Sequence, residues 1–167
     1  MESRAKLLGH PIHQMLIVFP LGLLGMAVIF DIVHLVVGRR GLTIASYYMI
    51  AAGVLTGLLA AVFGLIDWLA IPSGTRAKRI GAWHAIGNVT IVVLFAVSWW
   101  LRHLNPFVPS TLAFVLGLIG LGLALVTAWL GGELVDRLGV GVDDGANLDA
   151  PSSLSGEPAR ARAAPQR

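Results

Sequence analysis

The sequence has no cysteine, and only 13% of its 167 residues are charged, whereas 56% are hydrophobic. Without cysteine, the chain has no disulfides, thiolate metal ligands or cysteine nucleophile. A soluble domain typically carries about 25% charged residues, so this composition indicates an integral membrane protein. The sequence also has no Walker loop, Rossmann glycine pattern or serine nucleophile elbow, and no basic stripe with interleaved aromatics that would bind nucleic acid.

Four long apolar runs organise the chain. They cover residues 15–37, 44–66, 83–101 and 111–130. Each approaches the roughly 20 residues that a helix needs to cross about 30 Å of hydrocarbon, and a helix satisfies its own backbone groups in lipid. We therefore predict an all-α membrane protein with a four-helix transmembrane bundle over residues 8–142. Residues 143–167 are rich in Pro, Ala, Ser and Arg, which predicts a disordered cytoplasmic tail.

The loop charges predict the orientation of this bundle. Six cationic residues lie on the side of the two termini: Arg4, Lys6, Arg76, Lys78, Arg79 and Arg137. Three lie on the opposite side: Arg39, Arg40 and Arg102. Because cytoplasmic loops carry the excess of Lys and Arg, we predict that both termini are cytoplasmic and that the bundle contacts membrane lipid.

Polar residues from all four helices fall at the predicted cytoplasmic face. Histidine together with carboxylate suits a transition metal, and the candidate metal ligands are His13, His84, Asp67 and Glu133. A single b-type haem would instead use His13 and His84 as axial ligands, because its iron binds imidazole. The candidate cofactor-binding residues are then His10, His13, His84 and Asn88, with Asp67 and Glu133 orienting the imidazoles.

A second polar cluster lies near the opposite face, and its members are Asp31, His34, Arg102 and His103. Asp31 lies within an apolar run and needs a partner, for which His34 and Arg102 are the candidates. Asp31 also follows His13 by eighteen residues, a whole number of helical turns. If His13 faces the bundle interior, Asp31 should therefore face it as well.

Four motifs in order make the chain similar to a known family. They are Gly9-His10-Pro11-Ile12-His13 leading into Phe19-Pro20; Gly64-Leu65-Ile66-Asp67; His84 with Asn88; and Trp129-Leu130-Gly131-Gly132-Glu133-Leu134 leading into Gly139-Val140-Gly141-Val142. From about residue 8 to residue 142, the chain resembles the domain of unknown function 2231 family of bacterial membrane proteins. The resemblance implies a four-helix inner-membrane protein with no established activity, some of whose relatives are partners of, or fused to, redox modules. The chain departs from the family pattern at Gln14 and Val18, where relatives often have a proline and a further histidine.

Three functions are open at this point. The first is a redox-associated membrane protein that holds a metal or a single b-type haem at the cytoplasmic-side layer and works with a redox membrane-protein partner. The second is a proton-coupled or small-solute transport component that uses Asp31, His34 and the same layer as a relay. The third is a non-catalytic subunit that docks another membrane protein through its glycine faces. Those faces are Gly53 with Gly57 and Gly64, Gly22 with Gly25, and Gly117 with Gly120.

Overall fold

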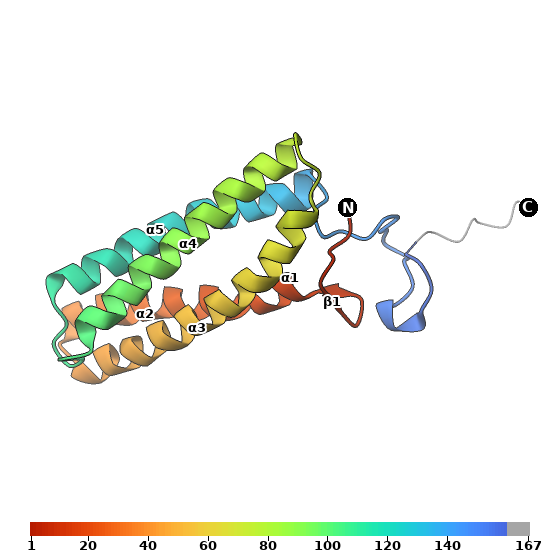
Figure 1. The fold of residues 1–167 in the computed structure, drawn as a ribbon. Coiled ribbons are helices and arrows are strands. Elements are labelled where there is room, and N and C mark those ends of the chain that lie inside the picture. Colours follow the sequence, from red (N-terminus) through yellow and green to blue (C-terminus); the bar gives the residue numbers. More distant parts are fainter. Residues whose placement is uncertain (160–167) are drawn as a thin grey trace, which may run out of the picture.

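The computed structural model describes residues 1–159, which form a bundle of four long helices (Figure 1). The helices are α2 (Val18–Val37), which continues from the short α1 (Ile12–Leu16), α3 (Arg40–Ala70), α4 (Arg76–Arg102) and α5 (Thr111–Gly132). A π-helical turn, η1 (Glu133–Arg137), extends α5. All four are long and apolar enough to cross a membrane, and the predicted four-helix membrane fold is therefore confirmed.

Local sequence determines where several helices begin and end. The Thr75 side chain accepts a hydrogen bond from the Lys78 amide at the start of α4, and Ser110 accepts one from the Ala113 amide at the start of α5. Such caps satisfy amides that have no partner within the helix. Gly38 ends α2 with a φ of 70°, a left-handed conformation that glycine adopts without steric cost.

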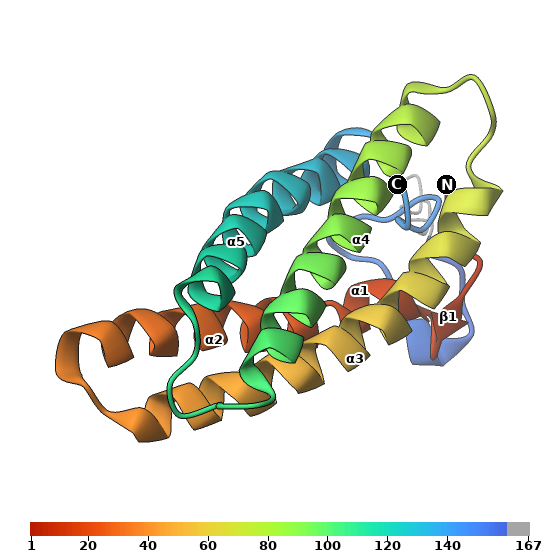
Figure 2. The same cartoon turned by 60° about the vertical axis from the view of Figure 1, so that its left-hand side comes forward.

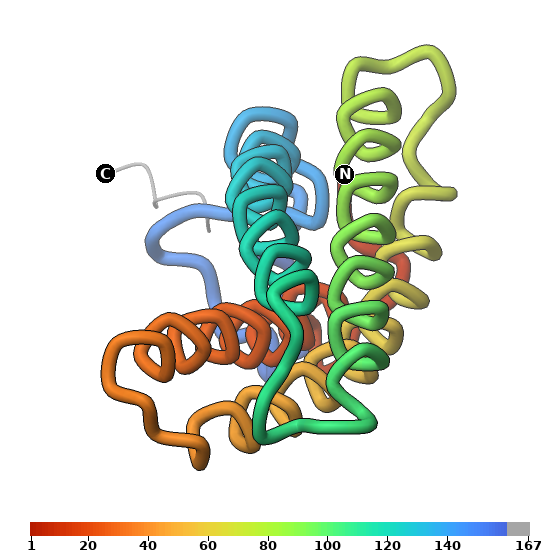
Figure 3. Tube along the Cα trace, turned by 90° about the vertical axis from the view of Figure 1, so that its left-hand side faces the viewer, coloured from red at the N-terminus to blue at the C-terminus, as the bar shows by residue number. Residues whose placement is uncertain are grey.

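The bundle consists of two helical hairpins, the first formed by α1, α2 and α3 and the second by α4 and α5. Viewed end on, the hairpins form two layers (Figure 3), and α4 lies between α5 and α3 (Figure 2). Buried apolar side chains fill the centre of the bundle: Leu24, Ala27, Val28, Ile50, Ile91 and Phe95. Many large apolar side chains elsewhere are exposed, including Leu55 and Leu125, as expected of a surface that faces lipid.

Most of the glycines considered as a docking surface pack within the bundle, whereas nothing lies within 4 Å of a Cβ added at Gly22 or Gly25. A Cβ on Gly53 would lie 2.7 Å from Cγ of Leu24, and one on Gly120 would lie 2.7 Å from Cε2 of Phe95. These positions therefore let neighbouring helices approach closely, as small residues do in membrane bundles. The other two contacts are Gly57 with Val92 and Gly117 with Val28.

Segments before and after the long helices lie together at one end of the bundle (Figure 1). Strands β1 (Lys6–Leu7) and β2 (His10–Pro11) form an antiparallel hairpin whose turn places Leu8 and Gly9 at positive φ. This hairpin was not predicted from the sequence. Residues 143–159, which include the short 3-10 helix η2 (Ser153–Ser155), contact the N-terminal segment. The remainder of the predicted disordered tail, residues 160–167, lies outside the described residues.

Candidate functional site

Two histidines from different hairpins meet inside the bundle. The ring centroids of His13, on α1, and His84, on α4, lie 6.4 Å apart, with the rings at 83° to each other. His13 Nδ1 lies 2.8 Å from the Ala60 carbonyl oxygen, and His84 Nδ1 lies 2.9 Å from the Thr127 carbonyl oxygen. Because a carbonyl only accepts, both Nδ1 atoms carry a proton and donate it. In the neutral rings each Nε2 keeps its lone pair, and neither Nε2 has a hydrogen-bond partner among residues 1–159.

Each imidazole also lies against a glycine one turn beyond the carbonyl that it contacts. A Cβ on Gly64 would lie 2.8 Å from Cε1 of His13, and one on Gly131 would lie 3.2 Å from Cε1 of His84. A larger residue at either position would push against the ring, because a packed interior has little room for added atoms. Both glycines belong to the motifs that carry the family resemblance, and these contacts give them a physical role.

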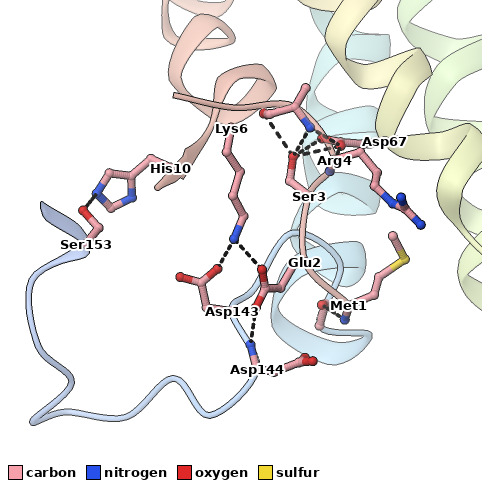
Figure 4. Close-up of polar contacts among 12 residues, drawn as sticks. Met1, Glu2, Ser3, Arg4, Lys6, His10, Asp67, Asp143, Asp144 and Ser153 are labelled. Atoms are coloured by element: carbon pink, nitrogen blue, oxygen red, sulfur yellow. Dashed lines mark hydrogen bonds and ion pairs between the residues drawn. The ribbon is translucent and has the colours of Figure 1, made fainter. Parts of the chain in front are cut away.

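Asp67 lies outside this histidine pair because the N-terminal segment occupies its carboxylate. Both of its oxygens accept from Ser3 Oγ at 2.8 Å, and Oδ1 also accepts from the Arg4 amide at 2.7 Å and the Ala5 amide at 3.3 Å (Figure 4). The carboxylate thus fastens the N-terminal segment to the end of α3. The sequence predicts that Asp67 orients an imidazole, but in the structure its carboxylate bonds to neither ring.

Glu133 is also engaged elsewhere, in an ion pair of 2.6 Å with Arg76 at the start of α4. The structure therefore brings together two of the four candidate metal ligands, His13 and His84. Within residues 1–159, no group of three or more His, Cys, Asp or Glu residues is arranged to hold a metal ion. Backbone carbonyls take the orienting role that we had expected of Asp67 and Glu133, because the ends of α3 and α5 run past the rings.

Of the other two candidate cofactor residues, Asn88 is close to the pair and His10 is not. Asn88 Nδ2 donates to the His84 carbonyl oxygen at 2.8 Å, and its Oδ1 accepts from Thr127 Oγ1 at 3.5 Å, which links α4 to α5 beside the site. His10 lies in the exposed β-hairpin, where its Nε2 is 3.3 Å from Ser153 Oγ (Figure 4).

Near the opposite end of the bundle, Asp31 and Arg102 form a buried ion pair. Nη1 of Arg102 donates to Oδ1 of Asp31 at 2.9 Å, and Nη2 donates to Oδ2 at 2.6 Å. Arg102 is 0% exposed and Asp31 is 4% exposed, and of the two candidate partners for Asp31 the structure pairs it with Arg102. Further contacts to the guanidinium come from Ser46 Oγ, Ser98 Oγ, the Ala113 carbonyl and the Phe114 ring.

The two histidines of the predicted outer cluster have other partners. His34 Nδ1 lies 3.0 Å from the Arg39 carbonyl oxygen, and His103 Nδ1 lies 3.1 Å from the Tyr47 hydroxyl. The structure does not join His34 to Asp31, whose two oxygens are both bonded by a guanidinium that keeps its protons. The geometry therefore gives no support to a proton relay through Asp31 and His34.

Outside the membrane-spanning helices, Lys6 joins the N-terminal segment to the segment after η1 (Figure 4). Its ammonium is bonded to the Asp143 carboxylate and lies 2.7 Å from Glu2. The hydrogen bond to Asp143, followed by that to Glu2, raises the pKa of Lys6, and the hydrogen bond from Lys6 lowers the pKa of Glu2. The Lys6 contribution to stability is present below the ordinary lysine pKa and is lost as pH rises through the raised one. The Glu2 contribution is present above the ordinary glutamate pKa and is lost as pH falls through the lowered one.

We expect acid to loosen this contact between the two segments. Because the chain has no cysteine, spin labels can be attached to cysteines introduced at the exposed Leu7 and Leu148. The distance distribution between the labels should be narrow at neutral pH and should broaden in acid, once the pH falls below the lowered pKa of Glu2 and the carboxylate takes up a proton. In Lys6→Met the distribution should already be broad at neutral pH. A distribution that stays unchanged through an acid titration would contradict the role given to Glu2 and Lys6.

Four membrane-length helices, paired as hairpins around a histidine pair, define a multi-pass membrane protein. The family described as predicted membrane protein (DUF2231) matches residues 9–144, and the chain belongs to this family. The resemblance carried by the sequence motifs is therefore confirmed. No curated protein and no solved structure matches the chain.

The partners of the two imidazoles were not predicted from the sequence. Backbone carbonyls at Ala60 and Thr127 carry no side-chain signal, since every residue has one. A signal was nevertheless present, because Gly64 and Gly131 follow these carbonyls by four residues each. Other glycines on the same two helices, such as Gly57 and Gly122, mean that this spacing alone does not identify the contacts.

Proposed function

We propose that the protein holds one metal centre between His13 and His84 and acts as a redox-associated component of the bacterial inner membrane. The observation that carries this proposal is that each imidazole donates its Nδ1 proton to a backbone carbonyl. Histidines that ligate metals almost always donate their second ring N–H in this way, which fixes the tautomer and leaves Nε2 for the metal. The site thus offers two imidazole ligands, one from each hairpin.

The separation of the rings supports a shared metal. Imidazole nitrogens bind metals at about 2.0–2.1 Å, so two rings that share one ion through Nε2 have centroids about 5 Å apart at a tetrahedral angle and about 6 Å apart at a linear one. The centroids of His13 and His84 are 6.4 Å apart. The contacts with the Ala60 and Thr127 carbonyls hold the rings at this separation.

The iron of a b-type haem suits a site with two protein ligands. A b-type haem would take two imidazoles from the protein, and His13 and His84 would supply them. A tetrahedral zinc site needs three or four protein ligands, but Asp67 and Glu133 are bonded to the N-terminal segment and to Arg76. The alternative to a haem is a transition-metal ion bound by the two imidazoles and by other small ligands. The experiment below distinguishes the haem from the ion.

We further propose that the histidine pair lies near the cytoplasmic face. The N-terminal segment, residues 143–159 and the α3–α4 connection lie at one end of the bundle (Figure 1). That end carries Arg4, Lys6, Arg76, Lys78, Arg79 and Arg137. An excess of Lys and Arg marks cytoplasmic loops, and His13 is only a few residues from this end.

An absorption spectrum and metal analysis of protein purified from membranes test the proposal. A haem gives a Soret band with about one haem per chain, whereas a bound ion gives about one transition metal per chain and no Soret band. His13→Ala and His84→Ala should each remove the bound group, because each deletes one of two ligands.

His34→Ala and His103→Ala serve as matched controls, since these rings contact the Arg39 carbonyl and Tyr47 instead. Both should keep the bound group. Purified wild-type protein with neither a Soret band nor a stoichiometric metal would contradict the proposal, as would a bound group that survives both His13→Ala and His84→Ala.

A further inference from the structure

The contacts of the histidine pair recur at matching positions of the two hairpins. On each hairpin, a histidine of the first helix bonds to a carbonyl of the second helix and lies against a glycine one turn further on. The matching residues are His13 and His84, Ala60 and Thr127, and Gly64 and Gly131. The first-helix residues are 71 positions apart, and both pairs of second-helix residues are 67 positions apart.

The same two sequence shifts, 71 residues for the first helices and 67 for the second, also relate a contact of the first hairpin to one of the second in the middle of the core. Leu24 packs against Gly53 in the first hairpin, and Phe95 packs against Gly120 in the second. Phe95 follows Leu24 by 71 residues, and Gly120 follows Gly53 by 67 residues. The contacts at the histidines and those in the middle of the bundle are thus related by the same two sequence shifts. This agreement indicates that the two hairpins are copies of one unit. The difference of four residues between the shifts falls in the connection between the two helices of each hairpin.

Residues that contact their own equivalents lie on the axis that relates the copies, as in an isologous interface. His13 and His84 are one such pair. Asp31 and Arg102 are another, because they are bonded to each other and are also 71 positions apart. Both hairpins start at the same end of the bundle, so the axis runs between them along the helices (Figure 3). Parallel repeats related by an axis along the membrane normal are one of the arrangements known in membrane proteins.

We infer that the chain is a tandem duplication of one helical hairpin, and that Asp31 and Arg102 make the first hairpin pair with the second. If the first hairpin paired with a copy of itself, two aspartates would meet at a buried position on the axis, and two second hairpins would bring two arginines together. Like charges in contact are strongly unfavourable where water is excluded. At the position of His13 and His84 both copies have histidine. This position therefore does not favour pairing of the first hairpin with the second over pairing of identical hairpins. The inference stands on these contacts and is independent of any bound metal.

Exchange of the two charges in the full-length protein tests this inference. Asp31→Arg and Arg102→Asp each place like charges on the axis, and each should reduce the folding equilibrium by about 100-fold or more. The double variant D31R/R102D restores opposite charges at equivalent positions and should recover most of the monodisperse protein seen by size-exclusion chromatography in detergent.

A second variant makes the test specific for the duplication. Ser98, one turn before Arg102, bonds to the guanidinium, and the equivalent position in the first hairpin is Ala27, which is also fully buried. Adding A27S/S98A to the charge exchange moves this hydroxyl together with the arginine, and should raise the thermal midpoint above that of D31R/R102D.

The surface ion pair of Arg76 with Glu133 provides the control, because its residues are not equivalent under these shifts. Arg76→Glu should leave the yield of monodisperse protein close to that of the wild type. A charge exchange that yields no more monodisperse protein than the single variants would overturn the pairing role. A transferred serine that fails to raise the thermal midpoint would overturn the equivalence of the two hairpins.

Discussion

Arg102→Met is expected to prevent the folded protein from accumulating in membranes. The substitution leaves the Asp31 carboxylate, which is 4% exposed, without the two guanidinium donors that bind its oxygens. Removing one partner of a buried pair costs about 3–5 kcal/mol, because the remaining charge is buried alone. That loss reaches the lower end of the free energy of unfolding of a marginally stable domain, about 5–15 kcal/mol.

Two variants show whether the buried charge is the cause. D31N/R102M should accumulate much better than Arg102→Met, because it removes both charges and leaves a neutral side chain at position 31. Arg76→Met removes the partner of Glu133 at a site where the Arg76 side chain is 52% exposed, and should cost less than about 1 kcal/mol. Membrane yield and the thermal midpoint in detergent measure both effects. Wild-type yield for Arg102→Met would show that the pair does not hold the hairpins together.

Gly120→Leu is expected to have the second largest effect on stability. A Cβ at this position would lie 2.7 Å from the ring of Phe95, which is 1% exposed and sits at the centre of the core. Neither the ring nor the backbone of α5 has space to yield. Overpacking of this kind costs about 1–3 kcal/mol, and the larger figure is expected for a whole side chain against a buried ring.

Gly122→Leu is the matched control on the same helix, because nothing lies within 4 Å of a Cβ added there. Its thermal midpoint should stay within a few degrees of the wild-type value, whereas Gly120→Leu should lower the midpoint strongly or abolish folding. Equal midpoints for the two variants would contradict the close approach of α4 and α5 at Phe95.

The parts of the fold that were predictable from the sequence follow from the cost of polar groups in lipid. Each apolar run had to form a helix because hydrocarbon offers no partner for the backbone. Asp31 had to find a counterion because a lone charge is expensive at that depth, and Arg102 was one of the two candidates within reach. These arguments need only local sequence and a depth in the membrane.

The contacts that were not predictable join distant segments through backbone groups. The Asp67 carboxylate binds amides of Arg4 and Ala5, which lie 63 and 62 residues away and have no distinctive side chains for this purpose. The hairpin formed by Lys6–Leu7 and His10–Pro11 is too short to give an alternating pattern. Consequently Asp67 looked like a metal ligand from the sequence, although it fastens the N-terminal segment.

The proposed duplication relates the two polar levels of the bundle to one another. His13 with His84 and Asp31 with Arg102 occupy equivalent axis positions near opposite ends of the same helices. In this account, the charged level determines which hairpins pair, and the histidine level receives one ligand from each hairpin. The histidine pair therefore depends on the outer ion pair for its assembly, although the two levels do not touch.

X-ray absorption at the edge of the bound metal, measured on protein purified from membranes, tests the central claim most directly. A metal centre shared by His13 and His84 predicts scattering from two imidazole rings with nitrogens at about 2.0 Å, lost in the double variant H13A/H84A. A purified protein without a stoichiometric metal, or a metal whose surroundings contain no imidazole, would contradict the account.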